Sequence, residues 1–294
     1  MTINAVVITD KNYFPFLKVT LLSLVKNTHN NLRIYCILSE KLEIADRRWL
    51  ENFESTFDNI NMEVIDYSLE KIEFKAKNHV SKAAFIKIDI PIILQEINKV
   101  IYLDSDLLIQ GDLTDLWSEF EDGVPLKGCW NPNYNYDNHT FNQNLEHKTF
   151  NSGVLLLDLE LMRRNNSNTK LRDFIIENNE KTRLNDQAAF NAIFQDWSEL
   201  PLSWNVQYIF YQHNASYFEM SKQELYKLKK SPKIVHFTTN SKPWMIRNAH
   251  PFKKEYLRYL RKADESFVFE DASLISLVKR IKEFLVVRWF CLFN

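Results

Sequence analysis

Short apolar runs rich in β-branched residues alternate with amphipathic segments along the N-terminal part of the chain. The runs with strand character cover residues 4–9, 32–38, 62–65 and 100–103. The segments with helical spacing cover residues 14–26, 42–57 and 82–95, and Pro91 interrupts the last of them. Strands that alternate with helices are typical of a mostly parallel sheet with helices on both faces. The chain is therefore expected to be an α/β protein whose ligands gather at the carboxyl ends of the strands.

The rest of the chain is less regular. Further strands are expected at 124–130, 154–157 and 233–237, and further helices at 169–179 and 186–196. Residues 131–148 form a long polar stretch rich in Asn, Tyr and His. A long loop in a compact domain is usually functional, so this stretch is expected to be a lid or a mobile segment.

Composition excludes several classes of protein. The 294 residues are 45% hydrophobic and 26% charged, which rules out a disordered or a fibrous chain. The 37 Lys and Arg residues balance 38 Asp and Glu residues, so no overall field draws the chain to nucleic acid. With 4 glycines in the whole chain, a Gly-rich phosphate loop is disfavoured.

Cysteine spacing and hydropathy indicate the cellular compartment in which the protein is expected. Cys36, Cys129 and Cys291 are far apart and form no CxxC or metal-binding spacing, which favours a reducing compartment. Residues 1–13 lack the basic start of a signal peptide. No stretch reaches the ~20 apolar residues that a membrane-spanning helix needs. A cytoplasmic location is therefore expected.

Two carboxylates follow the apolar run at 100–103, in the order Leu-Asp-Ser-Asp. In an extended chain residues i and i+2 point the same way, so Asp104 and Asp106 could both reach one cation. Carboxylate oxygens suit Mg²⁺ and Mn²⁺, which often bridge to phosphate oxygens. The alternative is a solvated turn that caps a helix, and the spacing alone leaves both open.

A histidine and a lysine lie at the end of the last expected strand. His236 belongs to the apolar run, and Lys242 follows six residues later, directly before Pro243 and Trp244. Histidine is the commonest metal ligand, and a lysine can meet phosphate charge, so the pair would suit a metal–diphosphate complex. The alternatives are a hydrogen-bonded structural histidine and an ordinary surface lysine.

Two more segments combine polar side chains with a buried run. In Phe-Asn-Ser-Gly, Gly153 could permit close backbone approach or a positive φ, with Asn151 facing a ligand; the alternative is a simple turn before a strand. In Leu-Asn-Asp-Gln, Asn185 or Asp186 would serve as a helix cap. Capping does not explain Gln187, whose amide could point at a substrate.

Together these four segments resemble the retaining glycosyltransferases of family 8, bacterial sugar-nucleotide enzymes that build lipopolysaccharide and related surface glycans. The resemblance covers roughly residues 3–250, with YLDSDLLIQGDLTDLW, FNSGVLLLDL, LNDQAAFN and HFTTNSKPW in the family's order. It implies a GT-A fold, with a Rossmann-like catalytic domain over 1–250 and a helical extension over 251–294. It also implies a UDP-hexose donor, with galactose or glucose, and a glycan or lipid-linked saccharide acceptor, for which residues 131–148 are the expected contact.

The resemblance implies a role for each matching residue. Asp104, Asp106 and His236 would be the ligands of Mn²⁺, or of Mg²⁺, which holds the diphosphate of the donor. Gln187 and Asp186 would lie around the donor sugar as the catalytic candidates. The remaining positions implied to bind the donor are Ile8, Thr9, Asp10, Asn12, Lys87, Ser105, Asn131, Asn151 and Lys242.

Three positions depart from the family's pattern. Thr239 stands where a glycine is common, and Asn131 stands where an acidic sugar contact is common. Lys87 replaces the usual arginine, so a point charge takes the place of a forked donor. None of these changes removes a metal ligand.

The implied reaction is transfer with retention of anomeric configuration. A divalent cation and Lys242 would stabilise the charge that develops on UDP as it leaves. A retaining glycosidase would use a carboxylate nucleophile, but Gln187 is a poor nucleophile. The expected mechanism is therefore front-face attack, in which the departing phosphate oxygen takes the proton of the acceptor.

The C-terminal segment 273–293 has helical spacing. Its apolar stripe comprises Leu274, Val278, Ile281, Leu285, Trp289 and Leu292. Lys279, Arg280, Lys282 and Arg288 outnumber the single acid, Glu283. A basic amphipathic helix can lie in the headgroup layer of an anionic membrane, and the alternative is a last helix that packs on the protein body. Peripheral contact with a membrane is therefore a second expected interaction.

Two other functions compete with glycosyl transfer. A D-x-D sequence after an apolar strand is also typical of phosphohydrolases that use an aspartyl nucleophile, although they carry it near the first strand and follow it with Thr or Val. Here it lies at 104–106 and Leu107 follows. The third possibility is a protein that binds a sugar nucleotide without turning it over.

Overall fold

The computed structural model describes residues 1–71, 82–132, 148–178 and 185–292. By its internal contacts the chain forms two compact units. Unit 1 comprises Met1–Phe14, His29–Ser105 and Leu113–Pro201. Unit 2 comprises Pro15–Thr28, Asp106–Asp112 and Leu202–Asn294. The division at residue 250 into a catalytic domain and an extension stays a prediction.

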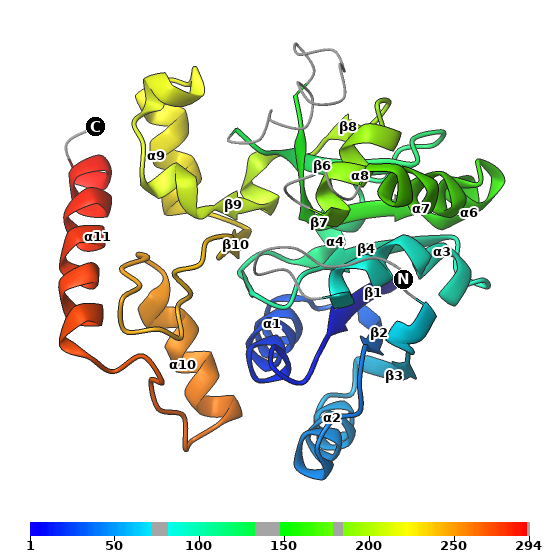
Figure 1. Cartoon of the computed structure of the whole chain (residues 1–294), viewed down its shortest axis with the longest axis horizontal. Coiled ribbons are helices and arrows are strands. Elements are labelled where there is room, and N and C mark those ends of the chain that lie inside the picture. The colour runs from blue at the N-terminus through cyan, green and yellow to red at the C-terminus, as the bar shows by residue number, and fades with distance from the viewer. Residues whose placement is uncertain (72–81, 133–147, 179–184, 293–294) are drawn as a thin grey trace. The chain divides into compact units, whose positions relative to one another are not determined.

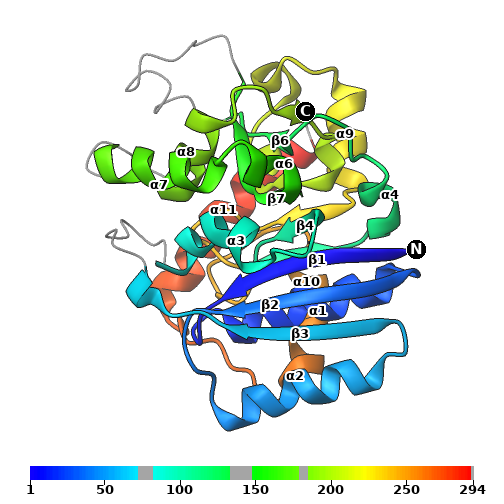
Figure 2. The ribbon, with the colours of Figure 1, turned by 90° about the vertical axis from the view of Figure 1, so that its right-hand side faces the viewer.

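Unit 1 is built on a 7-stranded sheet with the order β3-β2-β1-β4-β7-β6-β8. Its strands are β1 (Thr2–Thr9), β2 (Asn31–Leu38), β3 (Ile60–Asp66), β4 (Lys99–Leu103), β6 (Leu126–Trp130), β7 (Phe150–Asp158) and β8 (Ser198–Glu199). Strands β1, β2 and β3 lie side by side and parallel, as Figure 2 shows, and β4 is parallel to β1. Strand β7 runs antiparallel to both β4 and β6. The predicted mostly parallel α/β sheet is confirmed, with β7 as its antiparallel member.

Both faces of the central strands of this sheet are buried. On β1, Val6 and Ile8 face a core that α-helical and 3₁₀ segments cover, while Ala5 and Val7 on the opposite face are also fully buried. Burial on both faces is why these strands read as continuous apolar runs. The helical segments of unit 1 are α2 (Ile44–Thr56), η1 (Leu69–Lys71), η2 (Lys82–Asp89), α3 (Ile90–Ile93), α4 (Leu113–Trp117), α6 (Leu159–Arg164), α7 (Ser167–Asn178) and α8 (Asn185–Ile193).

Two local expectations for unit 1 differ from the structure. The single helix expected over 82–95 is instead the 3₁₀ segment η2 followed by the short helix α3. Pro91 lies in the first turn of α3, where its missing N–H costs no hydrogen bond. Gly153 lies inside β7, not in a turn, and it is not among the residues with positive φ, so that part of the prediction is wrong.

Unit 2 contains a small sheet with the order β5-β10-β9, and Figure 1 shows its helices α9 to α11 in yellow to red. Its strands are β5 (Leu107–Ile109), β9 (Val206–Gln207) and β10 (Ile234–His236). Its helical segments are α1 (Phe14–Asn27), η3 (Leu202–Trp204), η4 (Tyr208–Tyr211), η5 (Ala215–Phe218), α9 (Lys222–Lys230), α10 (Lys253–Ala263) and α11 (Leu274–Leu292). Strand β5 was not expected from the sequence. It pairs antiparallel with β10, and His236 lies opposite Leu107.

The expected C-terminal helix is α11, and the hydroxyl of Ser273 caps it by accepting from the Ser276 N–H at 3.1 Å. The helix packs on unit 2 through a stripe that includes Ser276, Glu283 and Val287. The described members of the predicted apolar stripe are exposed: Leu274, Val278, Ile281, Leu285 and Trp289 are 54% to 82% accessible. Within the described ranges, no helix is long and apolar enough to cross a bilayer.

Candidate functional site

In unit 1 the carboxyl ends of β1 and β4 meet at one edge of the sheet. The two strands are adjacent and parallel, with Val7 opposite Leu103. The hydroxyl of Ser105 donates to the carbonyl of Ile8 at 2.9 Å and so ties the two strand ends together. The prediction that Asp10 and Asp104 lie on the same rim is confirmed by this pairing.

Asp10 organises the start of α1. Its Oδ1 accepts from the Tyr13 N–H at 2.9 Å, which is the bond of a helix cap. Thr9 and Asp10 are buried, whereas Asn12 is exposed. The nucleoside-binding role of Ile8, Thr9, Asp10 and Asn12 stays a prediction, and the structure places all four at the end of β1 and the loop after it.

Lys87 is a fully buried lysine in η2 with three hydrogen-bonding partners. Its Nζ donates to Asp186 Oδ2 at 2.7 Å, to the Ser152 carbonyl at 2.9 Å and to Ser152 Oγ at 3.2 Å. Its side chain is 2% exposed and that of Asp186 is 9% exposed. Asp186 also accepts from Ser152 Oγ at 3.1 Å. Because both members of this buried pair also hydrogen-bond to Ser152, the pair fixes the start of β7 against the start of α8.

Asp104 is held beside this pair but remains partly open. Its Oδ1 accepts from the Tyr102 hydroxyl at 2.6 Å and lies 3.9 Å from Lys87 Nζ. Lys87 Nζ lies 4.3 Å from the centre of the Tyr102 ring. The Asp104 side chain is 30% exposed, so a carboxylate oriented by its neighbours still reaches solvent.

Two hydrogen bonds to its oxygen fix the orientation of the Gln187 side-chain amide. Oε1 accepts from the Ser152 N–H at 3.2 Å and from Asn151 Nδ2 at 3.1 Å. Because a backbone N–H can only donate, the amide oxygen must occupy this position and the nitrogen must point the other way. Among the described residues, Gln187 Nε2 is buried and has no hydrogen-bond partner. A buried donor without a partner is costly, which makes this nitrogen a candidate contact for a bound ligand.

Asn151 and Asn131 are two further predicted contacts. The Asn151 amide holds Gln187 and also accepts from the Gly153 N–H at 3.0 Å. Asn131 is buried at the end of β6, where its N–H donates to the Thr149 carbonyl at 2.8 Å. Their contact with the donor stays a prediction, and residues 133–147 of the stretch expected to contact the acceptor lie outside the described residues.

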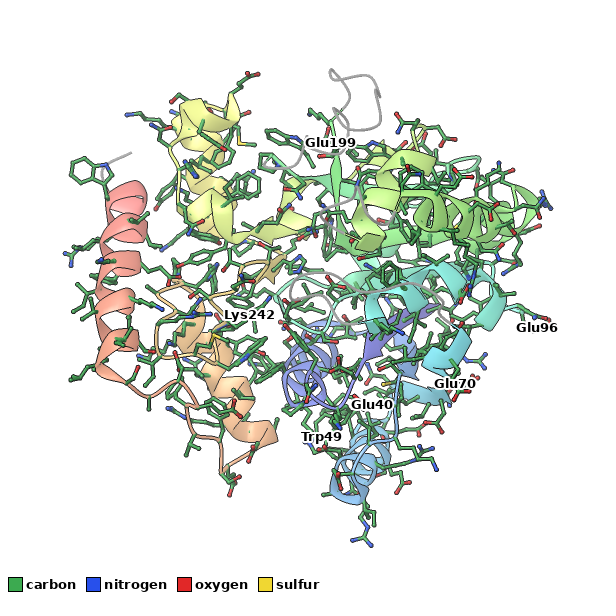
Figure 3. All side chains as sticks on the ribbon, viewed as in Figure 1. Glu40, Trp49, Glu70, Glu96, Glu199 and Lys242 are labelled. Carbon is green, nitrogen blue, oxygen red and sulfur yellow. The ribbon has the colours of Figure 1, made fainter. Side chains whose placement is uncertain are left out.

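In unit 2, Asp106, His236 and Lys242 form one buried cluster. His236 Nε2 lies 3.2 Å from Asp106 Oδ1, and Lys242 Nζ lies 2.6 Å from Asp106 Oδ2. Lys242 also donates to the Phe237 carbonyl at 2.6 Å, and Figure 3 labels it on the segment that follows β10. Burial raises the pKa of the Asp106 carboxyl, but the charges and hydrogen bonds of Lys242 and His236 outweigh burial and hold that pKa well below its usual range.

Asn205, at the end of η3, fixes the orientation of the His236 ring. His236 Nδ1 lies 3.0 Å from Asn205 Oδ1, and both side chains are buried. An amide oxygen only accepts, so Nδ1 carries a proton, and Nε2 is the nitrogen that faces Asp106 Oδ1. This arrangement is the one that metal-binding histidines commonly use.

The donor chemistry of these side chains fits a divalent cation. Asp104, Asp106 and His236 each offer one ligand atom, and Asp104 is separated from Asp106 by a single residue. Two carboxylates and an imidazole suit Mn²⁺ and Mg²⁺. In unit 2, His236 Nε2 and Asp106 Oδ1 face each other at 3.2 Å.

Sequence reasoning missed three residues of these clusters. Asn205 lies in an irregular segment with no spacing that links it to His236, and Tyr102 reads as a core residue of a strand. Ser152 lies in a motif that was recognised, but nothing in that motif indicates that its hydroxyl bridges Lys87 and Asp186.

Comparison with known proteins identifies the family. The model described as Glycosyl transferase family 8 matches residues 4–247, and the chain belongs to this family. General stress protein A of Bacillus subtilis is 28% identical over 260 residues, a match that covers 85% of this chain and 90% of that protein. Glycosyltransferase GlyE of Streptococcus pneumoniae is 27% identical over 245 residues, or 80% of this chain and 55% of GlyE.

Solved structures establish the fold. The galactosyltransferase LgtC in complex with donor and acceptor sugar analogs is similar with a TM-score of 0.73, covering 95% of this chain and 100% of LgtC at 18% identity. Apo GlyE of Streptococcus pneumoniae has a TM-score of 0.66, covering 88% of this chain and 60% of that structure at 24% identity. The fold is therefore GT-A, as predicted, and the family resemblance stated from the motifs is confirmed.

Proposed function

We propose that this protein is a retaining, metal-dependent hexosyltransferase that moves galactose or glucose from a UDP-sugar to a glycan or lipid-linked saccharide acceptor of a bacterial surface. Membership of glycosyltransferase family 8 supports the reaction class. The observation that carries the proposal is the buried cluster of Asp106, His236 and Lys242, because it combines metal-binding atoms with an ammonium group.

The cluster suits the diphosphate of a sugar nucleotide. Asp106 and His236, with Asp104, would hold Mn²⁺ or Mg²⁺, and the bound ion would neutralise charge on the diphosphate. Lys242 adds a cation that is positioned before any ligand arrives, since its Nζ is held by Asp106 and by the Phe237 carbonyl. A preorganised cation stabilises the charge that develops on the leaving group more than a mobile one does.

The residues of unit 1 are assigned to the sugar and the nucleoside. Gln187 Nε2, a buried donor without a partner among the described residues, would donate to an oxygen of the donor sugar. Asp186 is paired with Lys87 at 2.7 Å, so it would position Lys87 and the start of α8 and would not act as a nucleophile. The end of β1, with Ile8, Thr9, Asp10 and Asn12, would take the uridine.

Retention then follows from front-face attack. Neither Gln187, an amide, nor the ion-paired Asp186 is suited to form a glycosyl–enzyme bond. The acceptor hydroxyl would attack C1 on the face from which UDP leaves, the C1–O bond to the phosphate would break, and the departing phosphate oxygen would take the hydroxyl proton. Trapping a covalent adduct on either residue during turnover would contradict this step.

An assay of UDP release tests the proposal. The full chain is incubated with UDP-galactose, UDP-glucose or UDP-GlcNAc, with Mn²⁺ and then with excess EDTA. Turnover is expected with at least one hexose, to be lost with EDTA and to return with Mn²⁺. Asp106→Asn should lower turnover by about 10²- to 10³-fold, because charge stabilisation worth several kcal/mol is removed.

Asp122→Asn is the matched control. Asp122 is fully exposed, and its one ion pair with a described residue is with Lys99 at 3.1 Å, so turnover should stay within twofold of the wild-type value. Binding of UDP-hexoses without turnover would instead favour a non-catalytic binding protein. Release of inorganic phosphate without sugar transfer would favour a phosphohydrolase.

We also propose that the protein works at the inner face of the cytoplasmic membrane, held there by α11. The exposed apolar stripe of this helix, with Ile281, Leu285 and Trp289, is accompanied by the basic residues Arg280 and Arg288. An amphipathic helix of this composition binds anionic interfaces. A lipid-linked acceptor would make this contact useful.

A further inference from the structure

Unit 2 contains a cavity of about 510 Å³ that none of the proposed catalytic residues line. It lies among the turn that precedes α10, helix α10 itself, Phe269 and one side of α11. The charged residues of its lining are all basic: Lys253, Lys254, Arg261 and Arg280. Apolar contacts come from Leu257 and from the rings of Phe269 and Phe284. A basic cavity with apolar walls predicts an anionic ligand that carries an apolar part.

Lys253 is the buried lysine of the cavity lining. Its Nζ donates to the carbonyls of Met245, Ile246 and Asn248, the last at 3.0 Å, so all three of its protons are used. Burial and, to a smaller extent, the Arg280 charge lower its pKa to about 8, against the opposing effect of Asp271 and Glu283. The unfavourable effect of Arg280 shows that positive charge is concentrated here.

The two acids that act on Lys253 each accept a hydrogen bond from a group outside the cavity. Asp271 accepts from the Ile246 N–H at 2.6 Å, and Glu283 accepts from the Ser241 hydroxyl at 2.9 Å. Neither acid lines the cavity. Within the described ranges, the side chains of Lys254, Arg261 and Arg280 form no ion pair and no hydrogen bond. Three exposed cations whose side chains form no ion pair with a described residue therefore line one cavity.

The apolar surroundings indicate the rest of the ligand. Phe284 belongs both to the cavity wall and to the exposed apolar surface of α11, where it is 47% accessible. Guanidinium groups match phosphate oxygens through paired hydrogen bonds, and they fit a phosphate better than they fit a sugar hydroxyl or a carboxamide. A phosphate in the cavity would thus lie next to a surface suited to acyl chains.

We propose that this cavity binds the phosphate group of an anionic glycerophospholipid, with Arg261 and Arg280 donating hydrogen bonds to the phosphate oxygens. The inference deepens the membrane contact proposed for α11 and is independent of the transfer reaction. It distinguishes a defined headgroup site from general attraction between a basic helix and an anionic surface.

Vesicle binding of the full chain tests the proposal. Co-sedimentation is measured with phosphatidylcholine vesicles and with vesicles that also contain phosphatidylglycerol. The variant Arg261→Gln/Arg280→Gln changes two exposed residues of the cavity wall. The matched control, Lys279→Gln/Lys282→Gln, removes the same charge from exposed positions of α11 that do not line the cavity.

Wild-type protein is expected to bind the phosphatidylglycerol vesicles. The arginine variant should bind them at least about tenfold more weakly than the lysine control, because it loses charge-assisted hydrogen bonds as well as charge. Equal weakening of the two variants would overturn the headgroup site and leave general membrane attraction intact. Loss of binding only on deletion of 273–294, with both variants unchanged, would also overturn it. UDP release with a water-soluble acceptor should be the same in both variants, so failure here is separable from failure of the proposed reaction.

Calorimetry separates the two sources of phosphate. Short-chain dioctanoyl phosphatidylglycerol, below its micellar concentration, and inorganic phosphate are titrated into the same proteins at constant ionic strength. Binding of the lipid that the arginine variant loses supports the lipid headgroup. Binding of inorganic phosphate alone, or of neither probe, would overturn the lipid assignment.

Discussion

The buried pair of Lys87 and Asp186 allows a stability prediction worked from its geometry. Lys87→Met keeps an unbranched side chain of similar length and removes the ammonium. The change leaves Asp186 with the Ser152 hydroxyl, at 3.1 Å, as its remaining partner among the hydrogen bonds described above. A carboxylate that is 9% exposed and has lost its cation is costly to keep charged.

The expected loss is about 3–5 kcal/mol of unfolding free energy, the usual cost of removing one partner from a buried ion pair. That is a large share of the ~5–15 kcal/mol by which folded proteins are stable. For a unit of about 150–250 residues, each kcal/mol shifts the melting midpoint by about 2–4 °C, so the midpoint should fall by roughly 6–20 °C.

Thermal unfolding followed by circular dichroism measures this loss in Lys87→Met, Asp186→Asn and the double variant. The double variant removes both charges, so its cost should be at least about 2 kcal/mol smaller than the sum of the two single costs. Lys99→Met is the control, because Lys99 pairs with Asp122 on the surface at 3.1 Å and should lose no more than about 1 kcal/mol. If Lys87→Met costs no more than Lys99→Met, or if the two single costs simply add, the reasoning about the buried pair is refuted.

Two further predictions concern buried groups of unit 2. Asn205→Ala should raise the Kd for Mn²⁺ about 10- to 100-fold, while Asn205→Asp, which still accepts from Nδ1–H of His236, should retain most of the affinity. The electron paramagnetic resonance signal of free Mn²⁺ measures both affinities, and equal affinities in the two variants would contradict a positioning role for Asn205. Burial lowers the pKa of His250 to about 3, so the folded chain keeps this ring neutral while the unfolded chain takes up a proton below about pH 6.5. The free energy of unfolding should therefore fall by ~2 kcal/mol between pH 7 and pH 5, and urea unfolding of His250→Gln should lack that part of the decrease.

The local patterns of the sequence determined the order and type of most elements. Strands β1, β2 and β4 and the long helix α1 follow from apolar periodicity, because burial on one or both faces imposes a repeat that the sequence must carry. The D-x-D segment likewise placed two carboxylates at a strand end, since side chains alternate in an extended chain. The motifs then pointed to the family through their order.

Tertiary structure decided what those side chains contact. Lys87 and Asp186 are 99 residues apart in the chain, and His236 and Asn205 are 31 apart, so no local repeat could link either pair. Strand β5 exists because β10 pairs with it, which three apolar residues in isolation do not indicate. Tertiary structure also determined which face of α11 is exposed, because a helix that is apolar over most of its surface does not specify which side it buries. Periodicity is a property of neighbours along the chain, whereas hydrogen bonds and ion pairs between remote residues form only where folding brings them together.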